Sequence, residues 1–264
     1  MGDNKSEFGL LVYILPFLAV IPALYVMGWE SHEASILIVA VPFMTFPVIL
    51  IVGQVYNGEE FWKNKMKEGG ILALGALGAS LSAALWLVYD YVDALPNFDE
   101  QQSVTQWLEW VSFDLLQSDY TLTSGSKILG MGVWIDSITL MILFVATFLC
   151  FLICWFSLGY MNTDPINENR NHRFYGEFVL FALGMFGMVL ADNFLWLFIF
   201  WEVMGLCSYL LIGFYYWKDS AAYASKKAFL TTRVGDVFLM IGLFILYDIY
   251  GSLEFSVIFH DPSL

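Results

Sequence analysis

Residues 194–217, FLWLFIFWEVMGLCSYLLIGFYYW, are apolar or weakly polar along their whole length except for Glu202. The hydrocarbon core of a bilayer is about 30 Å thick, and a helix needs about 20 apolar residues to cross it. The stretch has that length and predicts a membrane-spanning helix. A charged side chain near the middle of such a helix costs at least about 2.5–3.5 kcal/mol to insert. Glu202 therefore requires a compensating partner or a function.

The rest of the chain has the same character. Hydrophobic residues make up 59% of its 264 residues and charged residues only 14%, and the apolar residues come in long blocks. A soluble domain carries more charge than this. We therefore predict an all-α fold, a polytopic transmembrane helical bundle of about seven spans. The predicted spans are residues 8–27, 34–55, 71–92, 133–160, 175–190, 194–217 and 227–250.

Composition and spacing also exclude several functions. A net charge of −14 argues against nucleic-acid binding. No GxGxxG follows a strand, and neither a phosphate-binding loop nor iron–sulfur spacing is present, so any redox chemistry belongs to another chain. The cysteines lie in apolar stretches as packing residues, and the histidines are scattered over connections, so no metal site is expected. These residues are Cys150, Cys154, Cys207, His32, His172 and His260.

Basic residues predict the orientation. Connections on one side of the membrane contain nine lysines and arginines, whereas the other side has only Lys127, and Arg233 lies inside a helix. Positive connections stay in the cytoplasm, so the amino terminus is predicted to be cytoplasmic. The first block also lacks the basic region and cleavage site of a signal peptide. The nine residues are Lys5, Lys63, Lys65, Lys67, Arg170, Arg173, Lys218, Lys226 and Lys227.

The longest connection, residues 93–131, is predicted to be exoplasmic. Within residues 103–116, Trp107, Leu108, Val111 and Leu115 have helical spacing, which predicts an amphipathic helix at the membrane surface. Residues 120–136 alternate around Ser-Gly-Ser, which predicts a small β-hairpin. The chain then divides into residues 1–132, with three spans and this loop, and residues 133–264, with four spans.

Three charged residues are predicted to meet inside the membrane. Glu202 is predicted to lie about 12 Å below the outer surface, and Asp236 about 14 Å deep in a helix that enters from the inside near Lys227, so adjacent antiparallel helices bring them to similar depth. Arg233 and Asp236 are spaced i, i+3 and can pair, either as a purely structural pair or within an ion path. Burial favours a neutral carboxyl and a nearby cation favours a charged one. Glu202 can thus load and release a proton, or it is a neutral acid bonded to a backbone carbonyl.

Further polar residues on these two helices have two readings each. The Thr231 and Thr232 hydroxyls either bond carbonyls of the preceding turn or hold waters of a proton path. Lys226 and Lys227, at the inner mouth, either extend to the interface or belong to that path. Ser208, with its small neighbours, allows close helix packing and is the remaining candidate for the path.

Two more carboxylates fall near helix amino ends. Asp136 precedes the fourth span, and Asp192 lies between the fifth and sixth. A carboxylate there satisfies free amides and the helix dipole, so capping is the favoured interpretation for both.

The blocks WE-x-x-GLCSYLLIGF (from Trp201) and KAF-x-x-TRVGD (from Lys227), with IDSITLMI upstream, resemble subunit L of complex I, the largest antiporter-like subunit of proton-pumping NADH:quinone oxidoreductase. The resemblance is strong over residues 136–253. It implies that Glu202 is the ion-pair glutamate of proton translocation, and that Arg233 and Asp236 are the charged positions of the following helix. It also implies a partner lysine on a further helix, whose movement changes the charge state of Glu202.

The sequence differs from the family pattern in two ways. The lysine, the broken helices and the lateral helix of such subunits would lie beyond Leu264, so the chain is expected to be an amino-terminal piece or one part of a split subunit. Three spans precede Asp136, whereas two are usual.

By this resemblance, the chain is a non-redox membrane-arm subunit of a respiratory complex in a prokaryotic or organellar inner membrane. Flavin, iron–sulfur clusters and quinone would belong to other subunits, and the electron donor would be NADH, reduced deazaflavin, ferredoxin or another carrier. The partners would be the other membrane-arm subunits and the lipid bilayer. One alternative is a subunit of a multi-subunit Na⁺/H⁺ antiporter. A second is a scaffold that translocates nothing.

Overall fold

Six long apolar helices make up most of the structure. Lipid tails offer no hydrogen-bond partners, so a chain crosses a bilayer as helices that satisfy their own backbone. The computed structural model describes residues 31–94, 106–113, 129–163 and 169–259, and within them six helices are long and apolar enough to span a membrane. The predicted span 8–27 lies outside these residues. The elements are α3 (Ser31–Val55), α4 (Gly70–Ala94), β1 (Gln106–Phe113), β2 (Leu129–Ile135), α5 (Ser137–Thr163), α6 (Asn171–Leu190), α7 (Phe194–Ile212), α8 (Asp219–Tyr250) and α9 (Phe255–Ile258).

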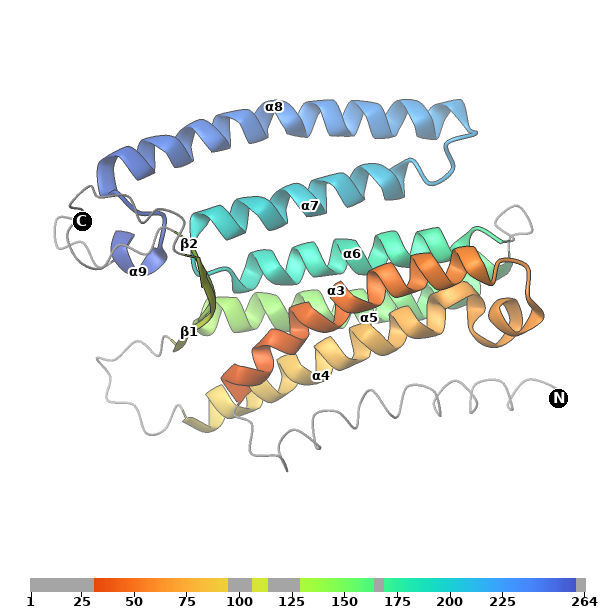
Figure 1. The fold of residues 1–264 in the computed structure, drawn as a ribbon, viewed down its shortest axis with the longest axis horizontal. Coiled ribbons are helices and arrows are strands. Elements are labelled where there is room, and N and C mark those ends of the chain that lie inside the picture. Colours follow the sequence, from red (N-terminus) through yellow and green to blue (C-terminus); the bar gives the residue numbers. More distant parts are fainter. Residues whose placement is uncertain (1–30, 95–105, 114–128, 164–168, 260–264) are drawn as a thin grey trace.

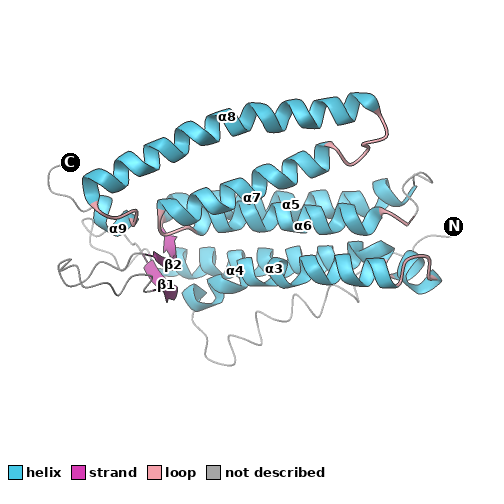
Figure 2. Ribbon diagram, turned by 45° about the horizontal axis from the view of Figure 1, so that its top comes forward, coloured by secondary structure: helices cyan, strands magenta, loops and turns pink. Residues whose placement is uncertain are grey.

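The six helices lie side by side and alternate in direction (Figure 1, Figure 2). The ends of α3, α5 and α7 meet the starts of α4, α6 and α8 at one end of the bundle. We call it the basic end, because Lys63, Lys65, Lys67, Arg170 and Lys218 lie there. The opposite end carries β1, β2 and α9 (Figure 1). This alternation agrees with the predicted uneven distribution of positive charge.

The packed core lies among α3, α4, α5 and α6. Helix α6 contacts α3, α5 and α7, while α4 contacts α3 and α5. Small residues allow close approach: a Cβ on Gly184 of α6 would lie only 3.0 Å from the backbone nitrogen of Met204 on α7. Helix α8 packs chiefly on α7 and forms one edge of the bundle (Figure 2). Helices α7 and α8 are therefore the least enclosed by the rest of the chain.

A buried carboxylate joins two connections at the basic end. Glu68 is 3% exposed and accepts hydrogen bonds from the backbone N–H groups of Asn169 (3.1 Å) and Asn171 (2.9 Å). A negative charge at the first residues of α6 also complements the helix dipole. The backbone turns sharply to reach this position, with Glu68 at φ 53° and Asn169 at φ 65°.

The opposite end is held together by backbone pairing. The turn between α6 and α7 bonds to the segment after α8: Phe194 N–H donates to Leu253 (3.0 Å), and Phe255 N–H donates to the Asp192 carbonyl (3.1 Å). The ring of Phe255 packs edge-on against those of Trp134 in β2 and Phe194 in α7. The start of α7 and the end of α8 are therefore fixed relative to each other.

The predicted amphipathic helix over residues 103–116 is wrong. Residues Gln106–Phe113 form β1, which pairs antiparallel with β2, Gln106 opposite Ile135 and Phe113 opposite Leu129. The segment QWLEWVSF is rich in residues that favour strands, and a partner strand outweighed its helical spacing. The predicted hairpin was correct in placing a strand at Leu129–Ile135, but that strand pairs with β1. Residues 114–128, including Ser-Gly-Ser, lie outside the described structure.

Four predicted helix ends were also wrong. Helix α6 begins at Asn171 rather than at Tyr175. Helix α5 begins at Ser137 rather than at Val133, because β2 occupies the residues before it. Helix α7 ends at Ile212, since Gly213 and an aromatic turn follow. Helix α8 begins at Asp219, eight residues before Lys227, because the polar but helix-favouring DSAAYASK segment continues the helix beyond its apolar part.

Glu68→Gln should destabilise the fold without touching any membrane charge. The amide NH2 group of glutamine replaces one carboxylate oxygen, so one of the two backbone N–H groups loses its acceptor, at a cost of about 1–3 kcal/mol. We expect a lower apparent Tm in detergent. Glu59→Gln, at an exposed position of the same connection, is the matched control. Equal Tm values for the two variants would contradict the assigned role.

Candidate functional site

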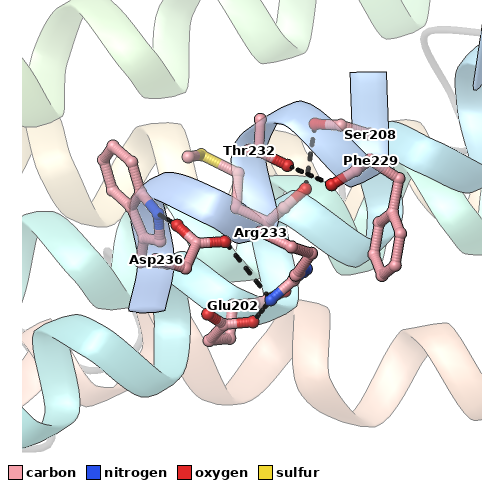
Figure 3. A network of polar contacts seen from close by, with 8 residues as sticks. Glu202, Ser208, Phe229, Thr232, Arg233 and Asp236 are labelled. Atoms are coloured by element: carbon pink, nitrogen blue, oxygen red, sulfur yellow. Dashed lines mark hydrogen bonds and ion pairs between the residues drawn. The ribbon is translucent and has the colours of Figure 1, made fainter. Parts of the chain in front are cut away.

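The candidate site is a cluster of charges between α7 and α8. The Arg233 guanidinium on α8 forms an ion pair with the Glu202 carboxylate on α7 through Nη1. The same nitrogen lies 3.4 Å from Oδ2 of Asp236, one turn along α8. Figure 3 shows Arg233 between the two carboxylates. One cation is therefore shared by two anions that come from neighbouring spans.

Asp236 has a second partner. Its Oδ1 accepts a hydrogen bond of 2.8 Å from the indole Nε1 of Trp201, the residue before Glu202. The Asp236 side chain is 10% exposed, whereas those of Glu202 and Arg233 are 29% and 26% exposed. Asp236 is thus the more enclosed carboxylate, and it is held by a donor and a cation together.

Local sequence makes room for this arrangement. A Cβ at Gly205, three residues after Glu202, would lie 3.1 Å from Nη2 of Arg233, so glycine leaves space for the guanidinium. The other face of that group lies over the Phe229 ring, 4.5 Å from its centroid, an arrangement in which the ring attracts the cation. Nη2 also reaches the Glu202 carbonyl at 3.5 Å. Glycine and phenylalanine thus define where Arg233 lies.

The structure brings together the three residues ranked first from the sequence. The expected Arg233–Asp236 pair is present, and Glu202 lies within reach of the same cation, so its partner is on the next helix. Asp236 is seventeen residues from the start of α8, about 26 Å along a helix of about 48 Å. The 14 Å was counted from Lys227, where the helix was predicted to enter the membrane, and stays a prediction, whereas the predicted meeting with Glu202 is present.

The five residues ranked second lie outside this cluster. The hydroxyls donate to carbonyls one turn earlier: Ser208 to Met204 and Thr232 to Phe229 (Figure 3), and Thr231 to Lys227. Lys226 and Lys227 are exposed in the second and third turns of α8. In this conformation none of the five contacts Glu202, Arg233 or Asp236 through an ion pair or hydrogen bond.

Trp201 and Glu177 were missed from the sequence. Trp201 was treated only as an apolar neighbour of Glu202, although an indole N–H beside a buried acid signals a donor. Glu177 lies in α6, is 8% exposed, and has Arg173 at 3.6 Å. The i, i+4 spacing of Arg173 and Glu177 could have indicated an ion pair from the sequence, but Arg173 was counted only as a residue of the connection.

Of the two predicted helix caps, the one by Asp136 is present and the one by Asp192 is not. Oδ1 of Asp136 accepts from Thr139 N–H at 2.7 Å, so Asp136 caps α5 as predicted. The cap of α7 is Asn193, whose Oδ1 accepts from Trp196 N–H at 2.8 Å. Asp192 instead accepts from the Asn193 amide at 2.7 Å. It orients the capping residue, so direct capping by Asp192 was wrong.

Within the described part of the chain, no three His, Cys, Asp or Glu side chains are grouped so that they could hold a metal ion. The three cysteines are buried and free, as expected of packing residues. Proton exchange is the chemistry that the cluster offers. Arg233 stays charged in proteins, so a proton that enters binds to a carboxylate.

A double-mutant cycle tests the shared cation. Glu202→Gln and Arg233→Gln should each lower the free energy of unfolding in detergent, and the double variant should lose less than the sum. Residues in direct contact typically couple by about 0.5–3 kcal/mol. The control cycle pairs Glu202→Gln with Arg170→Gln, because Arg170 lies at the basic end against Tyr216 and Trp217. Equal coupling in the two cycles would contradict the described geometry.

Comparison with known proteins gives this cluster a context. The chain is 36% identical over 196 residues to NAD(P)H-quinone oxidoreductase chain 5 of Synechocystis, covering 74% of this chain and 26% of that protein. It is 36% identical over 184 residues to NADH-quinone oxidoreductase subunit L of Pseudomonas aeruginosa, covering 70% and 27%. The subunit L of Mycobacterium tuberculosis is 33% identical over 225 residues, covering 84% and 31%. The chain thus spans about a quarter to a third of these relatives.

A solved structure shares the fold. A chain of the membrane-bound sulfane sulfur reductase, an archaeal respiratory membrane complex, superposes with a TM-score of 0.59 at 18% identity, covering 83% of this chain and 38% of that one. At that identity, the likeness concerns the arrangement of helices.

Two family models match separate parts of the chain. Residues 122–175 match the model described as NADH-Ubiquinone oxidoreductase (complex I), chain 5 N-terminus. Residues 191–261 match the model described as NADH:quinone oxidoreductase/Mrp antiporter, TM. The second match contains Glu202, Arg233 and Asp236. Over these residues the chain belongs to the family of antiporter-like membrane subunits that includes subunit L and chain 5 of NADH-quinone oxidoreductase.

Proposed function

We propose that this chain is a membrane-arm subunit of a respiratory complex I-like oxidoreductase and carries protons through Glu202, Arg233 and Asp236. One observation carries the proposal: a single guanidinium is shared by carboxylates of two adjacent spans within the family-matched residues. Electron transfer takes place on other subunits, which hold the flavin, the iron–sulfur clusters and the quinone. This chain contributes to the enzyme as a translocating, non-redox subunit.

The shared cation suggests how the proton is loaded. When Arg233 pairs with Glu202, the ionised carboxylate is stabilised. Asp236 is 3.4 Å away and already holds one hydrogen bond from Trp201, so it offers the cation an alternative partner. If Arg233 moves toward Asp236, Glu202 loses its counter-charge in an apolar environment, where the neutral form is favoured. Glu202 then takes up a proton and releases it when Arg233 returns.

The orientation follows from the positive-inside rule. Lys63, Lys65, Lys67 and Lys218 cluster at the basic end, so we place this end in the cytoplasm or the equivalent compartment. The end that carries β1, β2 and α9 then faces outward. An even number of spans lies between the amino end of α3 and the carboxyl end of α8, so both of these lie on the outer side. With the predicted span 8–27, the amino terminus is cytoplasmic.

A subunit of a multi-subunit Na⁺/H⁺ antiporter is the second candidate, since the family model at residues 191–261 also covers Mrp antiporters. The arrangement of charges favours protons at this site. A guanidinium occupies the space between the two carboxylates, where a sodium ion would bind. Redox subunits encoded nearby in the genome would support the first candidate, and small antiporter subunits without them the second.

Glu202→Gln should abolish coupled proton transport while the complex still assembles. Glutamine keeps the shape but cannot exchange a proton, and positioned proton-transfer groups contribute on the order of 10²–10⁴ in rate. We therefore expect at least about a tenfold loss of proton uptake by vesicles that contain the assembled complex. Glu60→Gln, an exposed position in the basic-end connection, is the control.

Two results would count against this role. Proton uptake at the control rate would remove Glu202 from the path. Failure of the complex to assemble with Glu202→Gln, but not with Glu60→Gln, would favour a scaffold that translocates nothing.

A further inference from the structure

We propose that Glu177 of α6 is a second proton-carrying carboxyl, loaded from a hollow at the basic end and passing its proton toward Glu202. This inference rests on the proposed function and adds an entry site to it. Glu177 is 8% exposed, and its Oε2 has no hydrogen-bond partner among the described residues. A buried carboxylate oxygen without a partner is costly, so its retention calls for an explanation.

Helix stability does not explain the residue. The pair is Arg173 followed by Glu177 at i+4, the less favourable order for a helical ion pair. Arg173 lies in the first turn of α6, where the helix dipole disfavours a cation. The 3.6 Å separation between Nη2 of Arg173 and Oε1 of Glu177 is also beyond a short hydrogen bond. The opposite order would make a stronger helical ion pair, so the pair adds little to the stability of α6.

A hollow gives the carboxyl access to the basic end. A cavity of about 370 Å³ is lined by Arg173, Tyr209, Ser225 and Lys226, among others, from α6, α7 and α8. The Arg173 side chain is 49% exposed, whereas that of Glu177 is 11% exposed. Arg173 lines the hollow and pairs with Glu177, which is not itself among the lining residues, so Arg173 connects the hollow to the carboxyl. When Arg173 turns into the hollow, Glu177 is left in an apolar environment and takes a proton from hydronium there, leaving water.

Glu177 lies on the way to Glu202. A Cβ on Gly184 would approach the backbone of Met204, so these residues mark one level of the α6–α7 contact. Counting from that level, Glu177 is about 13 Å nearer the basic end than Glu202, at 1.5 Å per residue. Cys207 lies between the two levels and is fully buried. The proton leaves Oε2 of Glu177 and is passed along water molecules toward Glu202.

The charged and titratable groups around Glu177 are few among the described residues. On α6 they are Arg173 and His172, the latter packed against Gly53 of α3. On α7 and in the turn after it they are Cys207, Tyr209 and Tyr216, and on α8 the group is Lys226; the two tyrosines and Lys226 line the hollow. Arg173 is the one that forms an ion pair with Glu177. Its position therefore controls whether the carboxyl is charged.

The test uses the assembled complex in vesicles and compares Glu177→Gln, Glu177→Asp and Glu202→Gln. Proton uptake and its pH profile are measured, with Glu60→Gln as control. We expect Glu177→Gln to slow uptake at least about tenfold, since proton-transfer groups contribute on the order of 10²–10⁴. Glu177→Asp keeps an ionisable group and should recover part of the rate with a displaced pH profile. If the Arg173–Glu177 pair were only structural, Glu177→Asp would not combine a partly recovered rate with a displaced pH profile.

The outcomes separate the two proposals. Control-rate uptake by Glu177→Gln together with a defect in Glu202→Gln would overturn the role of Glu177 alone. Control-rate uptake by both variants would overturn the proposed function as well. If Glu177→Gln prevents assembly, Glu177→Asp decides: an unchanged pH profile would overturn the inference, and a displaced profile with slower uptake would support it.

Discussion

The pairing of Arg233 with both Glu202 and Asp236 is the interaction on which the rest of the structure depends. An unpaired charge at that depth is too costly to keep, so α7 and α8 must lie together along one face. Contacts at both ends of α7 and α8 support this packing. At one end, Leu253 and Phe255 bond to the turn before α7, and at the basic end Arg170 lies over Trp217 in the turn before α8.

The core and the charged pair have different mechanical roles. Helices α3 to α6 bury their apolar residues against one another and form a rigid base. Helix α7 packs on that base, while α8 packs chiefly on α7. The cation can therefore change partners through small side-chain movements without disturbing the core. Glu177 lies where this base meets α7, so a proton that enters there reaches the charged pair without crossing the core.

Much of this organisation follows from the sequence, because the bilayer imposes one length and one polarity on every span. Long apolar blocks predicted the six described helices, and the few charges inside them predicted Glu202, Arg233 and Asp236. Errors arose where that constraint is absent. Residues Gln106–Phe113 became a strand because a partner strand was available, and α8 begins early because a polar segment continues a helix. Hydropathy alone cannot find Trp201 or Glu177, since their roles depend on which neighbouring helix they face.

Infrared difference spectroscopy on the assembled complex during turnover shows directly whether Glu202 changes its protonation state. We expect a band from a protonated carboxyl to appear when the complex is driven, and this band to be lost in Glu202→Gln. Asp236→Asn, which removes the alternative partner of Arg233, should also suppress the band although Glu202 is intact. Identical difference spectra for the wild type and Glu202→Gln would contradict the claim that Glu202 alternates between charged and neutral forms.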